Sequence, residues 1–135
     1  MCGIFGYTGT QTANNIVFDG LKRLEYRGYD SWGIAVLEKN EIHQYKDIGI
    51  VKSNKKLLKL PISNIGIGHT RWATHGGVTR VNAHPHTSQT KDFTLVQNGI
   101  VENFSSIKEN LINLGYKFTS ETDTEVIVKL IEEER

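Results

Sequence analysis

The sequence predicts one α+β domain, and three of its features favour this fold class. The 135 residues are 38% apolar and 23% charged, which is the balance of a soluble globular domain rather than of a disordered, fibrous or membrane protein. Short apolar runs typical of β-strands are interspersed with segments whose apolar residues recur at helical spacing. The chain has no internal repeat or linker, so we expect residues 1–135 to form a single unit.

The first elements expected are a strand and an amphipathic helix. Residues 3–8 form a short apolar run with interspersed glycines, typical of a buried strand that other groups approach closely. A helix is expected over residues 12–26, with Gly28 as its stop. Its apolar residues recur at i, i+4 and i+7, at Val17, Leu21 and Leu24.

The middle of the chain predicts a β-hairpin followed by a lysine-rich segment. Strand-like runs at residues 32–37 and 41–45 flank Lys39 and Asn40 at the spacing of a short antiparallel hairpin. The lysines within residues 52–59 predict the solvated face of a helix rather than a phosphate site.

Two further strands are expected on either side of a long loop. The strands cover residues 65–69 and 93–96, and the second ends at Asn98 and Gly99. Residues 71–89, which are rich in His, Thr, Gly and Asn, are expected to form the loop, and loops of that length in compact domains are often functional.

The C-terminal part predicts two helices. Ile107, Leu111 and Leu114 form an apolar stripe closed by Gly115. Residues 122–125 match a capping box, in which a threonine and a glutamate satisfy the first N–H groups of a helix. The second helix is expected to run to Arg135 without a stop signal, so we expect the chain to be a fragment whose sheets have exposed edges open to pairing with other chains.

Cys2 is the first candidate for chemistry. Removal of Met1 is expected before a small second residue and would make Cys2 the N-terminal residue. A free α-amino group can then accept the thiol proton near neutral pH, as in enzymes with an N-terminal nucleophile. The alternative is that a small apolar residue simply follows Met1.

Asn98 and Gly99 have two interpretations that are compatible with each other. An Asn-Gly pair after a strand is typical of a type I′ turn. An asparagine amide beside a backbone N–H can also bind the oxyanion formed when an amide is attacked.

A cluster at the start of the long loop is suited to holding a free amino acid. Arg71, Trp72, Thr74 and His75 supply a forked cation, an aromatic wall and hydroxyl and imidazole groups. Asp123, whose ordinary role would be to complement a helix dipole, is a candidate partner for the ammonium group. Together Arg71 and Asp123 would clamp a zwitterion, although spacing alone does not bring them together.

The histidines predict a polar rim around a site rather than a metal centre. They are His69, His75, His84 and His86. They lack the ligand spacing of zinc signatures, and the glycines near the N-terminus lack the context of a nucleotide site, so we expect no metal and no cofactor.

Composition also limits the partners and the compartment. A formal net charge of +1 gives no indication of nucleic-acid binding, and no apolar run approaches the ~18 residues needed to span a bilayer. A single cysteine excludes an internal disulfide framework and suits a reducing compartment, so we expect a cytoplasmic protein with no membrane partner.

Six segments of the chain together resemble the class II glutamine amidotransferases. Their sequences are CGIFGY (2–7), RLEYRGYDS (23–31), GHTRWATHG (68–76), NAHPH (82–86), NGIVEN (98–103) and SETDTE (120–125). They occur in the family's order over nearly the whole chain. The second and third are most similar to the members that aminate fructose 6-phosphate.

The resemblance implies an N-terminal nucleophile hydrolase fold, a four-layer αββα sandwich of which this chain carries the N-terminal part. It implies hydrolysis of glutamine to glutamate and ammonia, with Cys2 as nucleophile and, through its amine, as base, and with Asn98 and Gly99 as the oxyanion hole. The residues implied to hold glutamine are Arg71, Trp72, Thr74, His75, Gly99 and Asp123, and Arg27 is implied to position the terminus. The ammonia would pass to a sugar-phosphate isomerase portion that this chain lacks.

Two positions depart from the family pattern. Gln97 stands where a histidine is expected before Asn-Gly, and Trp32 stands where a small residue is expected and would crowd a tight site. Two rival hypotheses stay open. One is a catalytically silent fragment that binds glutamine or a partner subunit, with self-association as one form of assembly. The other is an N-terminal-cysteine amidohydrolase with a different amide substrate.

Overall fold

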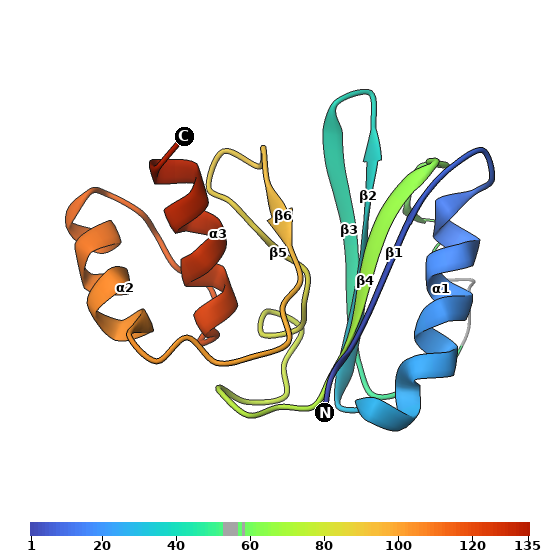
Figure 1. Cartoon of the computed structure of the whole chain (residues 1–135), viewed down its shortest axis with the longest axis horizontal. Helices are drawn as coiled ribbons and strands as arrows, with labels where there is room; N and C mark the ends of the chain where they lie inside the picture. Colours follow the sequence, from blue (N-terminus) through green and yellow to red (C-terminus); the bar gives the residue numbers. More distant parts are fainter. Residues whose placement is uncertain (53–56, 58) are drawn as a thin grey trace.

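Four layers of secondary structure lie side by side in the computed structural model, which describes residues 1–52, 57 and 59–135. Helix α1 covers one face of a four-stranded sheet, a two-stranded sheet faces its other side, and α2 and α3 form the outer layer (Figure 1). The elements in chain order are β1 (Gly3–Thr8), α1 (Ala13–Leu24), the 3-10 helix η1 (Glu25–Arg27), β2 (Ser31–Glu38), β3 (Glu41–Ile48), β4 (Ile65–Arg71), β5 (His86–Thr87), β6 (Thr94–Leu95), α2 (Phe104–Asn113) and α3 (Asp123–Glu133). This order of layers confirms the predicted fold class.

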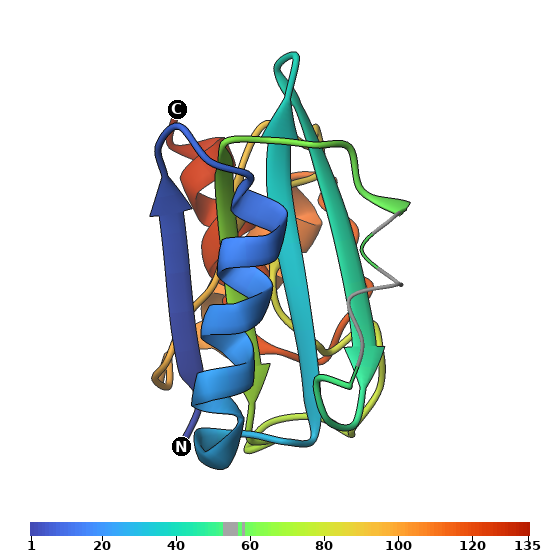
Figure 2. The same ribbon diagram turned by 90° about the vertical axis from the view of Figure 1, so that its right-hand side faces the viewer.

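The four-stranded sheet brings the start of the chain to the end of β4. Its strand order is β1-β4-β2-β3, and every neighbouring pair is antiparallel. Because Gly3 pairs with Thr70, Cys2 lies beside the residues that follow β4. Helix α1 crosses the outer face of this sheet (Figure 2).

The expected amphipathic helix is confirmed, and its apolar face forms the main core. Val17 and Leu21 of α1 pack with Trp32 and Ile34 of β2, and all four side chains are at most 2% exposed. Trp32 meets Phe18 edge-to-face, with the ring centroids 5.9 Å apart. The expectation that Trp32 crowds the site is therefore wrong, because alternation along β2 turns its side chain toward α1.

The structure confirms one of the two predicted turns and contradicts the other. Lys39 and Asn40 have φ values of 50° and 67°, which is the left-handed pair that a two-residue type I′ hairpin requires, so this turn is confirmed. Gly99 has φ +151°, whereas Asn98 is not among the described non-glycine residues with positive φ. The type I′ interpretation of Asn98 and Gly99 is therefore wrong. The lysine-rich helix expected over residues 52–59 lies largely outside the described residues.

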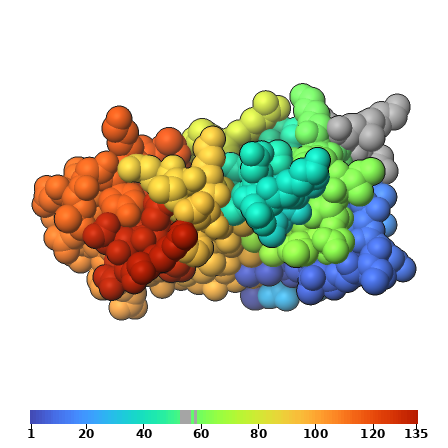
Figure 3. Space-filling model, turned by 90° about the horizontal axis from the view of Figure 1, so that it is seen from above, coloured from blue at the N-terminus to red at the C-terminus, as the bar shows by residue number. Residues whose placement is uncertain are grey.

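The second sheet is smaller than expected and is held to α3 by polar contacts. The loop expected over residues 71–89 contains β5, and the strand expected over residues 93–96 is reduced to β6. The two strands pair as a short antiparallel ladder. Seen from above, this hairpin and the C-terminal helices (yellow to red) form one half of the surface, and the first sheet with α1 (blue to green) forms the other (Figure 3).

Helix α3 begins where the sequence predicts, but not by the predicted capping box. Thr122 occupies the N-cap position without a side-chain capping bond. Its hydroxyl instead lies 2.8 Å from His86 Nε2, and the Glu125 carboxylate accepts the backbone N–H groups of Thr119 and Ser120. A tertiary partner thus replaces the local one for Thr122, and Glu125 bonds to the segment just before the helix instead of to its N-cap residue. No helix that the structure describes is long and apolar enough to cross a membrane.

Candidate active site

One cavity is lined by every residue that the sequence predicts to act in catalysis, in glutamine binding or in positioning the terminus. It has a volume of about 270 Å³ and opens at the end of the four-stranded sheet where β1 starts and β4 finishes. The predicted residues that line it are Cys2, Arg27, Arg71, Trp72, Thr74, His75, Asn98, Gly99 and Asp123. These residues come from the position before β1, from η1, from the end of β4 and the segment after it, from the segment after β6 and from the start of α3.

Cys2 is held by two segments that are distant in sequence, one contacting its side chain and the other its backbone. The backbone N–H of Trp72 donates to Cys2 Sγ at 3.1 Å. The side-chain amide of Asn98 donates through Nδ2 to the Cys2 carbonyl oxygen at 2.9 Å. Cys2 is half-buried and lines the cavity, so its sulfur is accessible to a small molecule.

Gly28 and Gly99 are required by the backbone around this cavity. A Cβ atom on Gly28 would lie 2.7 Å from the backbone carbon of Arg71 and 2.8 Å from the carbonyl oxygen of Thr70. The chain leaving η1 can therefore pass against the end of β4 only without a side chain at residue 28. Gly99 adopts φ +151°, which L-residues rarely take, and so directs the backbone that follows Asn98.

Arg71 organises the loop that forms one wall of the cavity. Its guanidinium donates to the carbonyl oxygen of Gly77 at 2.9 Å, to that of Gly76 at 3.5 Å, and to that of His75. Asp123 lines the same cavity from the start of α3 and accepts the backbone N–H of Val101 at 2.8 Å. The two members of the expected clamp thus lie around one space.

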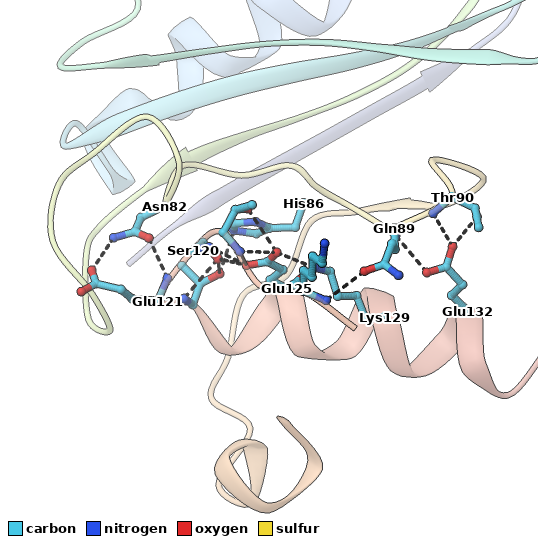
Figure 4. Close-up of polar contacts among 12 residues, drawn as sticks. Asn82, His86, Gln89, Thr90, Ser120, Glu121, Glu125, Lys129 and Glu132 are labelled. Atoms are coloured by element: carbon cyan, nitrogen blue, oxygen red, sulfur yellow. Dashed lines mark hydrogen bonds and ion pairs between the residues drawn. The ribbon is translucent and has the colours of Figure 1, made fainter. Parts of the chain in front are cut away.

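Sequence reasoning missed Asn82 and Glu121, which hold the same loop from the other side. Glu121 Oε2 accepts the N–H of Gly77 at 3.1 Å and the amide of Asn82 at 2.8 Å. The N–H of Glu121 donates in return to Asn82 Oδ1 at 2.9 Å, so the two side chains form a reciprocal pair (Figure 4). Both residues lie in segments that resemble a family, and nothing local in the sequence signals the contact between them.

The expected histidine rim is wrong for His69 and His86, which are not among the residues lining the cavity, whereas His75 and His84 do line it. His69, His84 and His86 are between 0% and 6% exposed, and the rings of His69 and His84 stack with centroids 4.0 Å apart. Burial lowers the pKa of His69 to about 4 and that of His86 to about 3, and it also lowers the pKa of His84. All three are neutral at pH 7. His75 is half-buried and, like His84, lies on the cavity wall.

Gln97 is part of the cavity wall and joins it to α3. Its Oε1 accepts the Thr124 hydroxyl at 2.9 Å, and its backbone N–H lies 3.4 Å from His84 Nδ1. The position where the family pattern has a histidine therefore carries a structural contact here. Among the described residues, no group of three or more His, Cys, Asp and Glu side chains is arranged to hold a metal ion.

A family model and individual relatives of this chain point to the same protein family. A model described as a glutamine amidotransferase domain matches residues 60–134. A glutamine–fructose-6-phosphate aminotransferase (isomerizing) of Pyrococcus horikoshii is 55% identical over 98% of the chain and 23% of that protein. A protein of the same name from Geobacillus kaustophilus is 50% identical over 98% of the chain and 22% of the relative. The chain thus spans less than a quarter of the length of these relatives.

Solved structures give the same result for the fold. Glutamine phosphoribosylpyrophosphate amidotransferase from B. subtilis, complexed with ADP and GMP, matches 98% of this chain and 29% of its own with a TM-score of 0.80 and 28% identity. A structure described as the allosteric regulatory enzyme of purine biosynthesis matches the same shares with a TM-score of 0.82 and 29% identity. The expected N-terminal nucleophile hydrolase fold is confirmed, and since the family model covers more than half of the sequence, the chain belongs to the glutamine amidotransferase domain family.

Proposed function

We propose that this chain hydrolyses glutamine to glutamate and ammonia with the sulfur of Cys2 as the nucleophile. The observation that carries the proposal is the placement of Cys2 Sγ in a cavity, 3.1 Å from the N–H of Trp72, with the Asn98 amide bound to the carbonyl of the same cysteine. Family membership and relatives named for glutamine support the choice of substrate.

The first chemical step depends on removal of Met1. Met1 lines the cavity, and its sulfur lies 3.9 Å from Arg27 Nη2, so its loss frees both the Cys2 amine and space beside Arg27. An α-amino group has a pKa of roughly 7.7–8.0 and accepts a thiol proton near neutral pH. Arg27 then acts as the residue that positions the new terminus.

The thiolate attacks the side-chain carboxamide carbon of glutamine. The resulting tetrahedral oxyanion is bound by the second N–H of the Asn98 amide and the backbone N–H of Gly99. Collapse breaks the carbon–nitrogen bond, and the nitrogen takes the proton from the Cys2 amine and leaves as ammonia. Water then hydrolyses the thioester on Cys2 to give glutamate and the free thiol.

The rest of the cavity wall selects a free amino acid. A guanidinium has five N–H donors, and the three bonds from Arg71 to loop carbonyls leave others for the α-carboxylate of glutamine. Asp123 receives the α-ammonium group, and Trp72, Thr74 and His75 enclose the ligand. This arrangement disfavours the rival amidohydrolase, since a peptide or acyl amide has no zwitterion to bind.

The proposal extends to the fate of the ammonia. The relatives are named as aminotransferases of fructose 6-phosphate and are more than four times as long as this chain. We propose that residues 1–135 are the N-terminal part of a glutaminase domain that acts in the cytoplasm. Its ammonia would supply a sugar-phosphate isomerase portion that makes glucosamine 6-phosphate. Neither nucleic acid nor membrane is a partner in this scheme.

The test is the release of glutamate from glutamine by the wild-type chain and by Cys2→Ala, after intact mass has established that Met1 is absent. We expect the wild type to be active and Cys2→Ala to lose roughly 10³-fold or more, since the nucleophile is removed. Cys2→Ser is the matched control, which should still bind glutamine while hydrolysing it slowly. Equal rates for wild type and Cys2→Ala would overturn the proposal. Glutamine binding without hydrolysis would favour the silent fragment.

A further inference from the structure

His69 is buried beneath the cavity and has no role in the reaction described above. It lies on β4, is 0% exposed, and directs Nε2 toward two oxygen atoms. These are the carbonyl oxygen of Gln97 at 3.1 Å and Oδ1 of Asn98 at 3.0 Å. The ring therefore contacts the residue proposed to bind the oxyanion and the residue that precedes it.

The tautomer of His69 follows from these partners. Burial keeps the ring neutral at pH 7, with a pKa of about 4, so the ring carries one N–H group. A backbone carbonyl oxygen can only accept a hydrogen bond, so the contact with Gln97 places the proton on Nε2. The same N–H then donates to Oδ1 of Asn98.

The Asn98 amide is consequently held between a donor and an acceptor. His69 Nε2–H faces its oxygen, and the carbonyl of Cys2 accepts from its nitrogen at 2.9 Å. A flipped amide would set NH₂ against an N–H donor and one carbonyl oxygen against another. Only one orientation satisfies both neighbours, and in that orientation the NH₂ group faces Cys2.

The peptide unit of Gln97 is fixed from two sides by neighbouring rings. Its N–H lies 3.4 Å from His84 Nδ1, and its carbonyl oxygen accepts from His69. The two rings stack at 4.0 Å with an angle of 12° between their planes. Gly33 of β2 permits this arrangement, because a Cβ there would lie 2.2 Å from the His84 carbonyl oxygen. The stack thus sets the direction in which the chain enters Asn98.

We propose that His69 is a positioning residue for glutamine hydrolysis, which fixes the Asn98 amide so that its NH₂ group serves the oxyanion formed beside Cys2. The proposal rests on the proposed function. His69 does not touch the substrate and exchanges no proton with it. Its contribution is made through Asn98, so it should affect the transition state more than the binding of glutamine.

The kinetic test compares His69→Leu, which removes the donor, with His69→Gln, whose amide restores an N–H donor. We expect His69→Leu to lower kcat about 10- to 100-fold while KM for glutamine changes little, since misplacing a group by about 1 Å can cost 10²-fold. His69→Gln should recover most of kcat. His43→Leu on β3, away from the cavity, is the control and should behave as the wild type.

Alkylation by iodoacetamide separates positioning from general damage. Cys2 is the one cysteine of the sequence, so the adduct reports its reactivity alone, and simple alkylation needs no oxyanion donor. We expect Cys2 in His69→Leu to be alkylated within about twofold of the wild-type rate. An unchanged kcat in His69→Leu would overturn the proposal. Parallel losses of kcat, glutamine binding and alkylation that His69→Gln does not recover would do so as well.

A second readout does not depend on activity. Hydrogen exchange of the Asn98 side-chain amide, followed by NMR, should be slow in the wild type and in His69→Gln and faster in His69→Leu. Exchange that is the same in all three variants contradicts the proposal even if none of them hydrolyses glutamine. An inactive wild type with the expected exchange pattern would instead count against the proposed function alone.

Discussion

On the α1 side of the four-stranded sheet, the core is made of apolar side chains such as Val17, Leu21 and Ile34, none of which is measurably exposed. On the other side many buried side chains are polar or charged, although apolar ones such as Val126 and Val128 are buried there as well. His69, His86, Glu125 and Lys129 are at most 3% exposed, and Figure 4 shows part of this network along one face of α3. Apolar burial stabilises without demanding direction, whereas each buried polar group needs a partner in a defined place.

This difference explains where the cavity lies. The apolar side tolerates any close packing of suitable volume, so it supports the sheet but specifies little about a ligand. The polar side fixes orientations through hydrogen bonds. The Glu125 carboxylate, for example, accepts hydrogen bonds from the backbone N–H groups of Thr119 and Ser120 and from the Lys129 ammonium. Thr122 and Asp123, which line the cavity, belong to this polar side.

The largest expected effect is on the polar side, from Lys129→Met. Lys129 Nζ lies 2.8 Å from Glu125 Oε1, and the two side chains are 4% and 3% exposed. Removing the ammonium leaves a buried carboxylate without its charge partner, which typically costs about 3–5 kcal/mol of unfolding free energy. Urea unfolding measures it, and the double variant with Glu125→Gln should recover part of the loss. A loss below about 1 kcal/mol for the single variant would remove the basis of the comparison.

A smaller effect is expected on the apolar side, from Leu21→Ala. Leu21 is 0% exposed, and truncating it leaves a cavity that costs about 3 kcal/mol, within the usual range of about 2–5. The alkylation rate of Cys2 should not change below the unfolding transition, because α1 does not line the active-site cavity. Leu114→Ala, at a side chain that is 62% exposed, is the matched control. A changed rate in Leu21→Ala would mean that the two sides are coupled.

The smallest effect per side chain is the pH dependence contributed by the buried histidines of the polar side. Burial lowers the pKa of His69 to about 4 and that of His86 to about 3, against roughly 6.5 in an unfolded chain. Between these values the unfolded chain binds more protons, so stability rises with pH in this window and is lost on acidification. Lowering the pH from 7.5 to 5 should cost about 2 kcal/mol per histidine, as read from urea midpoints.

The matched variant for the pH prediction is His69→Gln. It removes one titrating ring while keeping an N–H donor, so its stability should depend less on pH than that of the wild type over the same interval. A wild-type stability that is flat between pH 7.5 and 5 is the contrary result.

The apolar side is also the part that sequence reasoning predicts well. The spacing of Val17 and Leu21 predicts α1, and the two strand-like runs separated by Lys39 and Asn40 predict the hairpin. The polar side is predicted less well. The segment from Thr122 to Glu125 matches a capping box, yet the Thr122 hydroxyl contacts His86, since tertiary partners compete with local ones.

The candidate active site was likewise predicted only in part from the sequence. Side-chain chemistry and the resemblance of motifs together singled out most residues that line the cavity. No spacing brings Cys2 beside Trp72 and Asn98; antiparallel pairing of β1 with β4 does so for Trp72. The burial of His69 was missed because histidine in a polar motif favours an exposed position. Its register on β4, on the same face as Ile67, was the signal available. The pair of Asn82 and Glu121 had no local signal.

The most direct test of the central claim, that Cys2 attacks the side-chain carbonyl group of bound glutamine, is intact-mass analysis after incubation with a glutamine analogue that carries an electrophilic carbon at the carboxamide position. The wild-type chain, lacking Met1, should gain the mass of one adduct, glutamine in excess should slow the labelling, and Cys2→Ala should gain none. Absence of an adduct, or labelling that glutamine does not slow, would contradict the claim.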